Sequence, residues 1–463
     1  MSHVDTLARE LGPIVHTDAE RLARHGRDHW MLAEIDAFEG APRALPLAVI
    51  EPTSTNEVAR ALALCRALRV PVVPYGGGSG VCGAIQPEIG AVALSTRALA
   101  GLRRLDATDL LAVYGAGTMG GDAERLLEPH GLTLGHWPQS IELSTVGGWV
   151  ATRASGQYST AYGNVEDLVL ALEVVLADGT VLRTRETPRA AAGPDLRQLF
   201  LGSEGTLGVV TEVTFSVRAR PAATRGQAFH FASFAGGLEP IRRALRGGFA
   251  PPVARLYDAR ESRRNFRDFV PQGRALLLLL HEGPASVVPC ELEHVERLCR
   301  EAGGVPTDAA VVDQWLARRN HVPSFRSFLE QGVVVDTIEV AATWSRVGAL
   351  YDGVVAALSA VPGVLAATAH SSHSYRSGTC LYFSFAAKPD DPRRLRETYT
   401  ACWQAAMQAT LAAGGGIAHH HGIGRVRRPY LAAELGDAGL GVLRAVKRAL
   451  DPDGLLNPGN LIP

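Results

Sequence analysis

Three adjacent histidines, His419, His420 and His421, are the residues of this sequence that most directly suggest chemistry. Imidazole titrates near neutral pH and is the usual proton shuttle in enzymes. Because neighbouring side chains of an extended segment point in opposite directions, at most two of the three can face one ligand. A solvated turn and a zinc site are the alternatives for such a cluster. The role of the histidines therefore has to be inferred from the segments around them.

A glycine run, Gly76 to Gly80 with Ser79, follows a β-branched stretch that ends at Pro74 and Tyr75. Glycines at the end of a strand let backbone N–H groups approach an anion closely, because no Cβ stands in the way. A flexible turn is the simpler interpretation. The run lacks both the G-x-G-x-x-G spacing of dinucleotide-binding folds and the G-K-[ST] ending of a P-loop. It is a candidate pyrophosphate-binding loop of another type.

Two more segments rich in small residues follow, WPQSIELSTVGGWVATRASG at 137–156 and GSEGT at 202–206. The first shows little regular periodicity, and we expect it to be irregular. Long irregular segments inside compact domains are usually functional. Three such segments without a nicotinamide-binding fingerprint favour one long, phosphate-containing cofactor held along its length.

Composition limits the class of protein. The chain has 463 residues, which suggests roughly two or three domains. A net charge of −1 gives no reason to expect binding to nucleic acid or to an anionic membrane. No apolar run approaches the roughly 18 residues of a membrane span, and the N-terminus lacks a signal-peptide core. The six cysteines form no C-x-x-C pair. We expect a cytoplasmic protein with reduced thiols, and the Ala-, Arg- and Gly-rich composition suggests a bacterial source.

Hydrophobic periodicity predicts two kinds of domain. Helical spacing in 1–45, a short strand closed by Pro52, a helix over 58–68 and a strand over 69–74 begin an α/β unit. An Asp-Gly turn between two β-branched runs predicts a hairpin. Beyond Pro221, strands alternate with helices in an order typical of an α+β domain with a largely antiparallel sheet. The expected strands there are 228–234, 253–257, 274–281, 337–341 and 379–385; the expected helices include 285–302, one ending at Leu411, and 438–450.

Several strings carry a resemblance to a known family: PYGGGSG, PQSIELSTVGGW, TRASG, YGNVEDLV, GPDLRQLFLGSEGTLGVVTE, HHHGIG and LDPDGLLNPGN. Their order and spacing resemble the vanillyl-alcohol-oxidase/p-cresol-methylhydroxylase superfamily of FAD enzymes, most of all its alkyldihydroxyacetonephosphate synthases. The resemblance implies an α+β fold: a PCMH-type FAD-binding domain of two α/β subdomains over 1–220, including the helical stretch 1–45. A cap domain over 221–415 and a C-terminal segment over 416–463, which returns to the FAD domain, complete it.

The resemblance implies FAD as the cofactor. Many relatives attach the flavin covalently through a histidine in the first glycine loop. Because Gly77 and Gly78 occupy that region here, we expect non-covalent FAD. The residues that the resemblance places at the cofactor are Pro74, Tyr75, Gly76, Gly77, Gly78, Ser79, Gly80, Pro138, Ser140, Ser144, Thr145, Gly148, Thr152, Ala154, Ser155, Gly156, Glu204, Gly205, Leu207, Gly208, Val210 and Asn457.

The catalytic groups implied by the resemblance are His419, His420, His421, Tyr382 and Arg255. A phenol such as that of Tyr382 moves a proton only if its pKa is lowered or if it is coupled to a base. On their own, Tyr382 would be interpreted as a core residue and Arg255 as a surface ion-pair partner.

Metal-dependent members of the superfamily carry a G-H-x-G-D-G-x-x-H string and an E-H-G motif. The corresponding stretch here reads SHSYRSGTCLYF, and only His373 and His421 remain of the ligands. We therefore expect no metal. The synthases also have an arginine just before the tyrosine strand, where the approximate alignment places Ser371. Its loss would weaken recognition of a phosphate, unless Arg376 substitutes.

The resemblance implies an enzyme that works through flavin N5. The favoured hypothesis is a redox-neutral ether-lipid reaction, in which a fatty alcohol replaces the acyl group of acyl-dihydroxyacetone phosphate. One alternative is an FAD-linked oxidase or dehydrogenase of an alcohol or 2-hydroxy acid, and another is a flavin-binding protein without turnover. The expected partners are a small-molecule substrate and a second copy of the chain, with no nucleic acid, no membrane span, and peripheral membrane contact if the substrate is a lipid.

Overall fold

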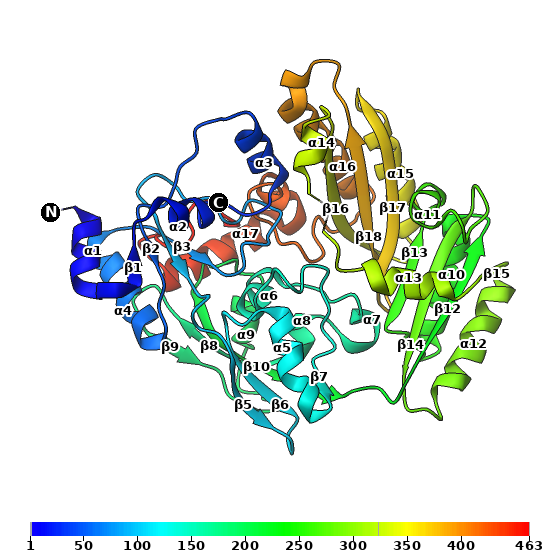
Figure 1. Ribbon diagram of the computed structural model, residues 1–463, viewed down its shortest axis with the longest axis horizontal. Coiled ribbons are helices and arrows are strands. Elements are labelled where there is room, and N and C mark those ends of the chain that lie inside the picture. Colours follow the sequence, from blue (N-terminus) through cyan, green and yellow to red (C-terminus); the bar gives the residue numbers. More distant parts are fainter. Residues whose placement is uncertain (1, 323, 463) are drawn as a thin grey trace.

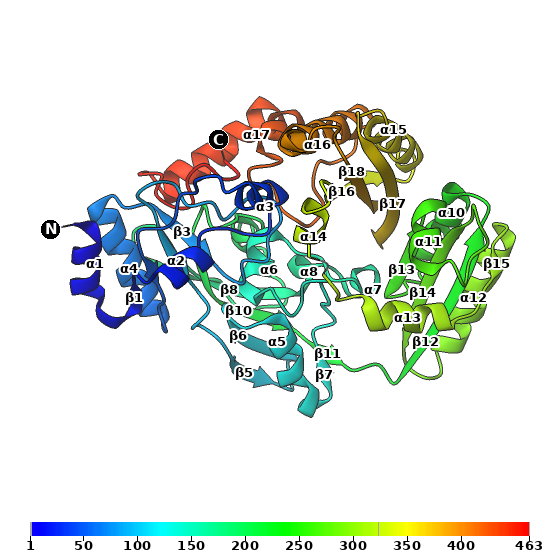
Figure 2. The ribbon, with the colours of Figure 1, turned by 45° about the horizontal axis from the view of Figure 1, so that its top comes forward.

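The computed structural model describes residues 2–322 and 324–462. In the described residues its strands form a four-stranded, a five-stranded and a two-stranded sheet in the first half of the chain and one large sheet in the second half, with helices packed around them (Figure 1). The two halves lie side by side, and the C-terminal helix returns to the first half (Figure 2). In the described residues no helix has the length and apolar character needed to cross a bilayer.

The first sheet has the strand order β1-β2-β4-β3 and carries the glycine run. Its strands are β1 (Val15–His16), β2 (Val49–Ile50), β3 (Val72–Tyr75) and β4 (Val92–Ser95). The crossover helix α4 (Thr55–Leu68) includes the helix predicted over 58–68 and begins at Thr55, because the Ser54 side chain accepts a hydrogen bond from the backbone N–H of Glu57. Strand β3 ends at Tyr75, so the glycines leave the sheet at a strand's carboxyl end.

The second sheet is antiparallel, in the order β5-β6-β10-β8-β9. Its strands are β5 (Leu102–Asp106), β6 (Leu111–Gly115), β8 (Val169–Val175), β9 (Val181–Arg183) and β10 (Val209–Ser216). The predicted hairpin is present: Gly179, with φ 87°, turns the chain between β8 and β9. Helix α5 (Gly120–Leu127) and the short pair β7 (Leu132–Thr133) and β11 (Arg218–Ala219) complete this part.

The segment over 137–156 is not irregular throughout, contrary to our expectation. Helix α6 (Val146–Thr152) occupies its centre, and Thr145 caps it through a hydrogen bond from the Gly148 N–H. Val146, Trp149 and Val150 follow helical i, i+3, i+4 spacing and are buried. The small residues between them hid this pattern.

The large sheet has seven strands in the order β15-β12-β14-β13-β17-β18-β16, and every pair is antiparallel. The strands are β12 (Ala223–Phe231), β13 (Val253–Tyr257), β14 (Ala275–Gly283), β15 (Val305–Pro306), β16 (Val334–Thr343), β17 (Val364–Ser374) and β18 (Gly378–Ala387). The sequence did not predict β17, because Ala, Ser and His stand at most of the positions where strands usually carry β-branched and aromatic residues.

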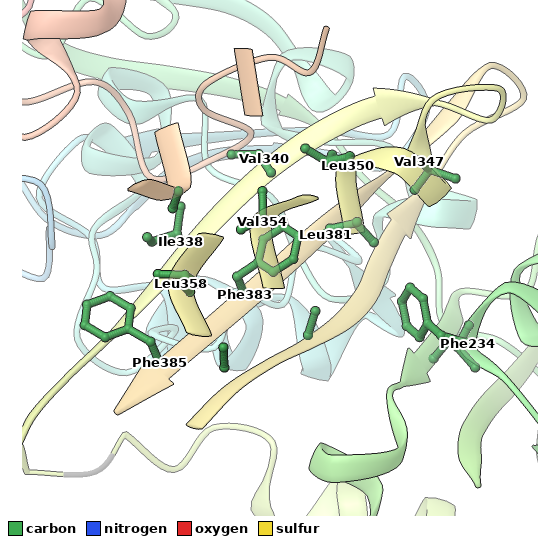
Figure 3. Packing of buried hydrophobic residues seen from close by; sticks show 14 of the residues in the cluster. Phe234, Ile338, Val340, Val347, Leu350, Val354, Leu358, Leu381, Phe383 and Phe385 are labelled. Atoms are coloured by element: carbon green, nitrogen blue, oxygen red, sulfur yellow. The ribbon is translucent and has the colours of Figure 1, made fainter. Parts of the chain in front are cut away.

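One face of this sheet is apolar and lies against helices. Side chains of α15 (Val347–Ser359), including Leu350 and Val354, pack on Ile338 of β16 and Phe383 of β18 (Figure 3). Burial of each such side chain contributes about 1.5–3 kcal/mol. The helices α10 (Phe234–Arg246), α12 (Val288–Glu301) and α16 (Leu395–Ala412) extend the same core. Because side chains alternate along a strand, the residues between these apolar ones face the first half of the chain.

The C-terminal segment joins the first sheet. Helix α17 (Leu431–Leu450) starts earlier than predicted and is kinked at Gly436. After it, the backbone N–H of Val72 donates to the Leu455 carbonyl, and that of Asn457 donates to the Val72 carbonyl. The remaining helices are α1 (His3–Leu11), α2 (Ala19–Arg24), α3 (Met31–Phe38), α7 (Ser159–Tyr162), α8 (Val165–Leu168), α9 (Arg197–Phe200), α11 (Ala259–Phe266), α13 (Ala310–Arg318) and α14 (Arg326–Leu329).

Candidate active site

A cavity of about 860 Å³ lies between the two halves of the molecule. The glycine run and the small residues of 138–155 line one side, and the polar face of the large sheet lines the other. We call these the glycine face and the cap face. Ligand pockets commonly fall in the range of roughly 300–1,000 Å³, so the volume suits a large ligand.

The glycine face is shaped by close backbone approach. A Cβ on Gly77 would lie 2.1 Å from the carbonyl oxygen of Leu143, and one on Gly76 would lie 2.6 Å from Oγ1 of Thr145. Neither position has room for a side chain. Within the described residues, the N–H groups of Gly76, Gly77 and Gly78 have no hydrogen-bond partner. Such N–H groups, unpaired and beside a cavity, suit a pyrophosphate.

Most of the predicted cofactor residues line this cavity. They are Pro74, Tyr75, Gly76, Gly77, Gly78, Ser79, Gly80, Pro138, Ser140, Ser144, Thr145, Gly148, Thr152, Ala154, Ser155, Glu204, Gly205, Gly208, Val210 and Asn457. Gly156 and Leu207 do not belong to the lining. Gly156 packs against the backbone of Trp137, and Leu207 lies in the hydrophobic core behind α6.

The carboxylate of Glu204 binds the chain rather than facing outward. It accepts hydrogen bonds from the backbone N–H of Ile423 at 2.5 Å, from that of Gly424 at 2.9 Å, and from Nδ2 of Asn460 at 2.9 Å. Asn457 donates from its Nδ2 to the Glu204 carbonyl at 2.8 Å. Glu204 and Asn457 thus fix the segment that directly follows the three histidines beside the glycine face.

On the cap face, four side chains stand in register across neighbouring strands. Glu339 of β16 is opposite Tyr382 of β18, Tyr382 is opposite His370 of β17, and His370 is opposite Tyr257 of β13. Directly opposed residues lie close together on one face of a sheet. Sequence reasoning found Tyr382 and missed the other three, because their neighbours come from strands far apart in the chain.

His421 is the histidine that has a carboxylate partner. Its Nδ1 lies 2.7 Å from Oε2 of Glu339, and its backbone N–H donates to Oε1 at 2.9 Å. Glu339 is fully buried and also accepts from Nη2 of Arg427 at 2.6 Å. Burial alone would raise the pKa of Glu339, but Arg427 and His421 hold the pKa of that carboxyl well below its usual range. Glu339 is therefore an anion that orients the ring of His421.

The other two histidines of the triplet contact each other. Nδ1 of His419 lies 2.9 Å from Nδ1 of His420, and Nε2 of His419 lies 2.7 Å from the hydroxyl of Tyr375. Desolvation lowers the pKa of His419 to about 4 and that of His420 well below its usual value. Both rings are neutral at pH 7. His420 and His421 belong to the cavity lining, whereas His419 does not.

His373 reaches the same cluster through a break in β17. It has φ 53° at an irregularity in the pairing of β17 with β18, between Ser372 and Ser374. A bulge of this kind re-aims a side chain. The His373 ring lies 4.9 Å from that of His420, and its Nδ1 lies 2.7 Å from Oγ of Ser159.

Among the described residues, Cys380, His419 and His420 place three potential metal-ligand atoms within 4.8 Å of one another. A zinc ion bound by these groups would require a thiolate. Burial raises the pKa of the Cys380 thiol well above its usual value, and the two histidines already contact each other through their Nδ1 atoms.

Tyr382 is placed to donate a hydrogen bond. Oγ1 of Thr337 donates to its hydroxyl at 3.1 Å, and its ring stacks on His370 with centroids 4.9 Å apart. The ring of His421 approaches edge-on at 5.7 Å. Desolvation raises the pKa of Tyr382 far above its usual range, so the phenol keeps its proton. The Tyr382 hydroxyl can therefore donate a hydrogen bond into the cavity.

Arg255 lines the cap face, as the resemblance implies, but Ser371 does not. Ser371 points to the opposite side of β17, where its hydroxyl lies 2.7 Å from Oγ1 of Thr379. Its neighbour His370 faces the cavity and contacts Arg255. Because side chains alternate between the two faces of a strand, Ser371 and His370 lie on opposite sides of β17. Arg376 is exposed and is not part of the lining, so it does not substitute here.

Two family profiles match the chain. Residues 46–185 match the family described as FAD binding domain, and residues 220–461 match FAD linked oxidases, C-terminal domain. An uncharacterized FAD-linked oxidoreductase, YgcU, from Escherichia coli (strain K12) is 31% identical over 436 residues, covering 90% of this chain and 89% of that protein. Alkyldihydroxyacetonephosphate synthase from Dictyostelium discoideum is 29% identical over 92% of this chain and 74% of its own length.

Solved structures agree with these matches. An alkyldihydroxyacetonephosphate synthase superposes with a TM-score of 0.83 at 26% identity, covering 99% of this chain and 86% of that one. p-Cresol methylhydroxylase with substrate bound superposes with a TM-score of 0.77 at 16% identity, covering 99% and 95%. The second likeness concerns the fold alone. The predicted fold class, a PCMH-type FAD-binding domain with an α+β cap, is confirmed.

The residues present fit the cofactor. The glycine face offers backbone N–H groups without partners and no room for side chains, which suits the pyrophosphate of FAD, and the cavity continues from there to Tyr382 and His421. The chain belongs to the FAD-linked oxidase family, and its cofactor is FAD.

Proposed function

We propose that this protein is an FAD-dependent enzyme that exchanges the acyl group of an acyl-dihydroxyacetone phosphate for a fatty alcohol, without net oxidation or reduction. His421 is the general base of this reaction. The observation that carries the proposal is the contact between Nδ1 of His421 and the buried anion of Glu339, 2.7 Å away. Within the described residues, Nε2 of His421 makes no hydrogen bond, and the residue lines the cavity shared with the glycine face.

The geometry assigns a direction to the proton. Glu339 favours the tautomer in which Nδ1 of His421 carries hydrogen, so Nε2 is the acceptor that faces the cavity. When Nε2 takes a proton from the substrate carbon, the nearby carboxylate stabilises the imidazolium that forms. The Asp or Glu partner of a catalytic histidine works in the same way in other enzymes.

Bound FAD supplies, at N5 of its isoalloxazine, the site that accepts the substrate carbon or a hydride. The protein supplies the rest. Tyr382 keeps its proton and can donate a hydrogen bond to a substrate oxygen that gains charge. His420 is neutral beside it and adds no competing positive charge.

Exposed apolar side chains also contribute to the cavity lining. Leu143, Val322 and Phe325 line the cavity, and the first two are each 44% exposed. Side chains that are both exposed and part of the lining mark an opening. An apolar opening gives a long chain a path from the site to the surface, which favours a lipid substrate. The similarity to the synthases supports the same choice.

A second candidate is oxidation of a small 2-hydroxy acid, with the proton again taken by His421 and the hydride passing to the flavin. Two arginines of the cavity lining favour it. Arg255 and Arg319 both line the cavity, and within the described residues neither forms an ion pair. Two such cations suit a compact anion such as a carboxylate.

One anaerobic experiment separates the two. The holoenzyme is mixed with palmitoyl-dihydroxyacetone phosphate and labelled hexadecanol while the flavin spectrum is recorded. Label in the ether product with the flavin still oxidised supports the transfer reaction. No label, together with bleaching of the flavin by a 2-hydroxy acid, would reject it in favour of oxidation.

A further inference from the structure

His370 is held at both ring nitrogens. Its Nε2 lies 2.6 Å from Nη2 of Arg255, and its Nδ1 lies 3.2 Å from both carboxylate oxygens of Glu261. A guanidinium can only donate, so Nε2 of His370 must be the acceptor. Nδ1 therefore carries the hydrogen and donates it to Glu261. Burial, reinforced by Arg255, lowers the pKa of His370 to about 4, in agreement with a neutral ring.

Arg255 has a fixed orientation, and no carboxylate of the described residues lies within ion-pair distance of it. Its Nε donates to the hydroxyl of Tyr257 at 2.7 Å, and Nη2 is held by His370. Within the described part of the chain it forms no ion pair, and it lines the cavity. Its charge is therefore available to a ligand.

A second cation stands near it. The guanidinium carbons of Arg255 and Arg319 lie 5.9 Å and 6.0 Å from the ring centre of Trp315, and Trp137 and Tyr158 also pack against Arg319. Aromatic contacts hold a guanidinium in place without neutralising it. The two guanidinium groups thus lie near the same aromatic ring of the cavity lining.

We propose that Glu261 and His370 form a positioning pair that presents the Arg255 guanidinium as the anion-binding group for the substrate. Glu261 fixes the tautomer of His370, His370 accepts from Arg255, and the free edge of Arg255, together with Arg319, binds a phosphate or a carboxylate. This inference rests on the proposed function, because Arg255 would bind the anionic group of the same substrate. It gives the histidine at position 370 a part in substrate recognition rather than in proton transfer.

The chain contains a matched control. His281, which is buried, and Glu291, which is half-buried, form a second pair in the same domain, with Nδ1 2.8 Å from Oε1, and neither residue lines the cavity. Replacing His281 disturbs a comparable pair without touching Arg255. His370→Gln keeps an acceptor oxygen for Arg255, whereas His370→Leu removes it.

The test measures binding to the holoenzyme by isothermal titration calorimetry, with dihydroxyacetone phosphate and with glycolate as separate probes. We expect His370→Leu to weaken the better-binding probe at least tenfold, His370→Gln to stay within threefold of the unaltered protein, and His281→Leu to leave it unchanged. The better probe tells phosphate from carboxylate. Flavin content and melting temperature establish that each variant is folded.

Three results would overturn the proposal: neither probe binds the unaltered protein, His370→Leu binds normally, or His281→Leu weakens binding as much as His370→Leu. The titrations are made without oxygen, and the flavin spectrum is recorded to detect any reduction by glycolate. Because they measure anion binding and not the transfer reaction, the proposed reaction can fail while this inference stands, and the inference can fail while the reaction stands.

Discussion

The two faces of the cavity recognise ligands by different means. The glycine face consists of backbone and small hydroxyl side chains, and its shape depends on the absence of Cβ atoms at Gly76 and Gly77. The cap face consists of titratable side chains in cross-strand register, with Tyr382 between His370 and the histidine cluster. Substitutions on the first face should act through steric exclusion of the cofactor. On the second face they should act through the placement of protons and charges.

Among single substitutions on the glycine face, we expect Gly77→Ala to have the largest effect on cofactor binding. The new Cβ would meet the Leu143 carbonyl at 2.1 Å, a contact that neither backbone segment can relieve cheaply. We expect the purified variant to lose nearly all its flavin, measured as the ratio of flavin to protein absorbance. Gly348→Ala is the control, because a Cβ there has nothing within 4 Å. Full flavin content in Gly77→Ala would contradict the steric account.

Substitutions of the histidines in the triplet should lower kcat to different extents. His421→Gln removes the base that faces Glu339, and we expect kcat to fall by roughly 10²–10⁴ while the flavin stays bound. His419 lies outside the cavity lining, so His419→Gln should lower kcat less than about tenfold. Steady-state kinetics of the two variants make the comparison. Equal losses would mean that the triplet acts as a unit.

A smaller effect is expected for Tyr382→Phe. The ring keeps its stacking on His370, and only the hydroxyl that Thr337 contacts is removed. Loss of one donor to a developing charge typically costs about 10²-fold in kcat. Because Tyr382 retains its proton at all working pH values, the shape of the pH profile should not change. A shifted profile would show that the phenol titrates.

The smallest predicted effect concerns stability in the FAD half. His136 is fully buried against Trp149, and burial lowers its pKa to about 3. A histidine with a lowered folded-state pKa stabilises the protein fully above the unfolded value of about 6.5, and this contribution is lost as the pH falls below it. His136→Leu should flatten the fall in stability below pH 6.5 by up to about 1.4 kcal/mol per pH unit. Melting temperatures of both proteins between pH 6.5 and pH 4 measure it, and parallel curves would contradict the prediction.

Much of the glycine face could be predicted because its signal is local. A glycine run after a strand and a cluster of small residues are visible within about ten residues of sequence. Helix α6 was missed because only Val146, Trp149 and Val150 carry its periodicity. Gly156 and Leu207 matched the family pattern but serve packing rather than lining.

The cap face was less accessible to sequence reasoning. Glu339 is 82 residues from His421, and Glu261 is 109 residues from His370, so only the sheet brings them together. The absence of a predicted strand over β17 also hid the register that points His370, and not Ser371, into the cavity. Once β17 is recognised, alternation along the strand identifies His370 directly.

The central claim is that His421, oriented by Glu339, is the base in a flavin site whose cofactor is held by the opposite face. The most direct test is anaerobic turnover of palmitoyl-dihydroxyacetone phosphate and labelled hexadecanol by the unaltered and His421→Gln holoenzymes. The account predicts label incorporation with oxidised flavin in the first, and at least a hundredfold slower incorporation with the flavin still bound in the second. Undiminished incorporation by His421→Gln would contradict it.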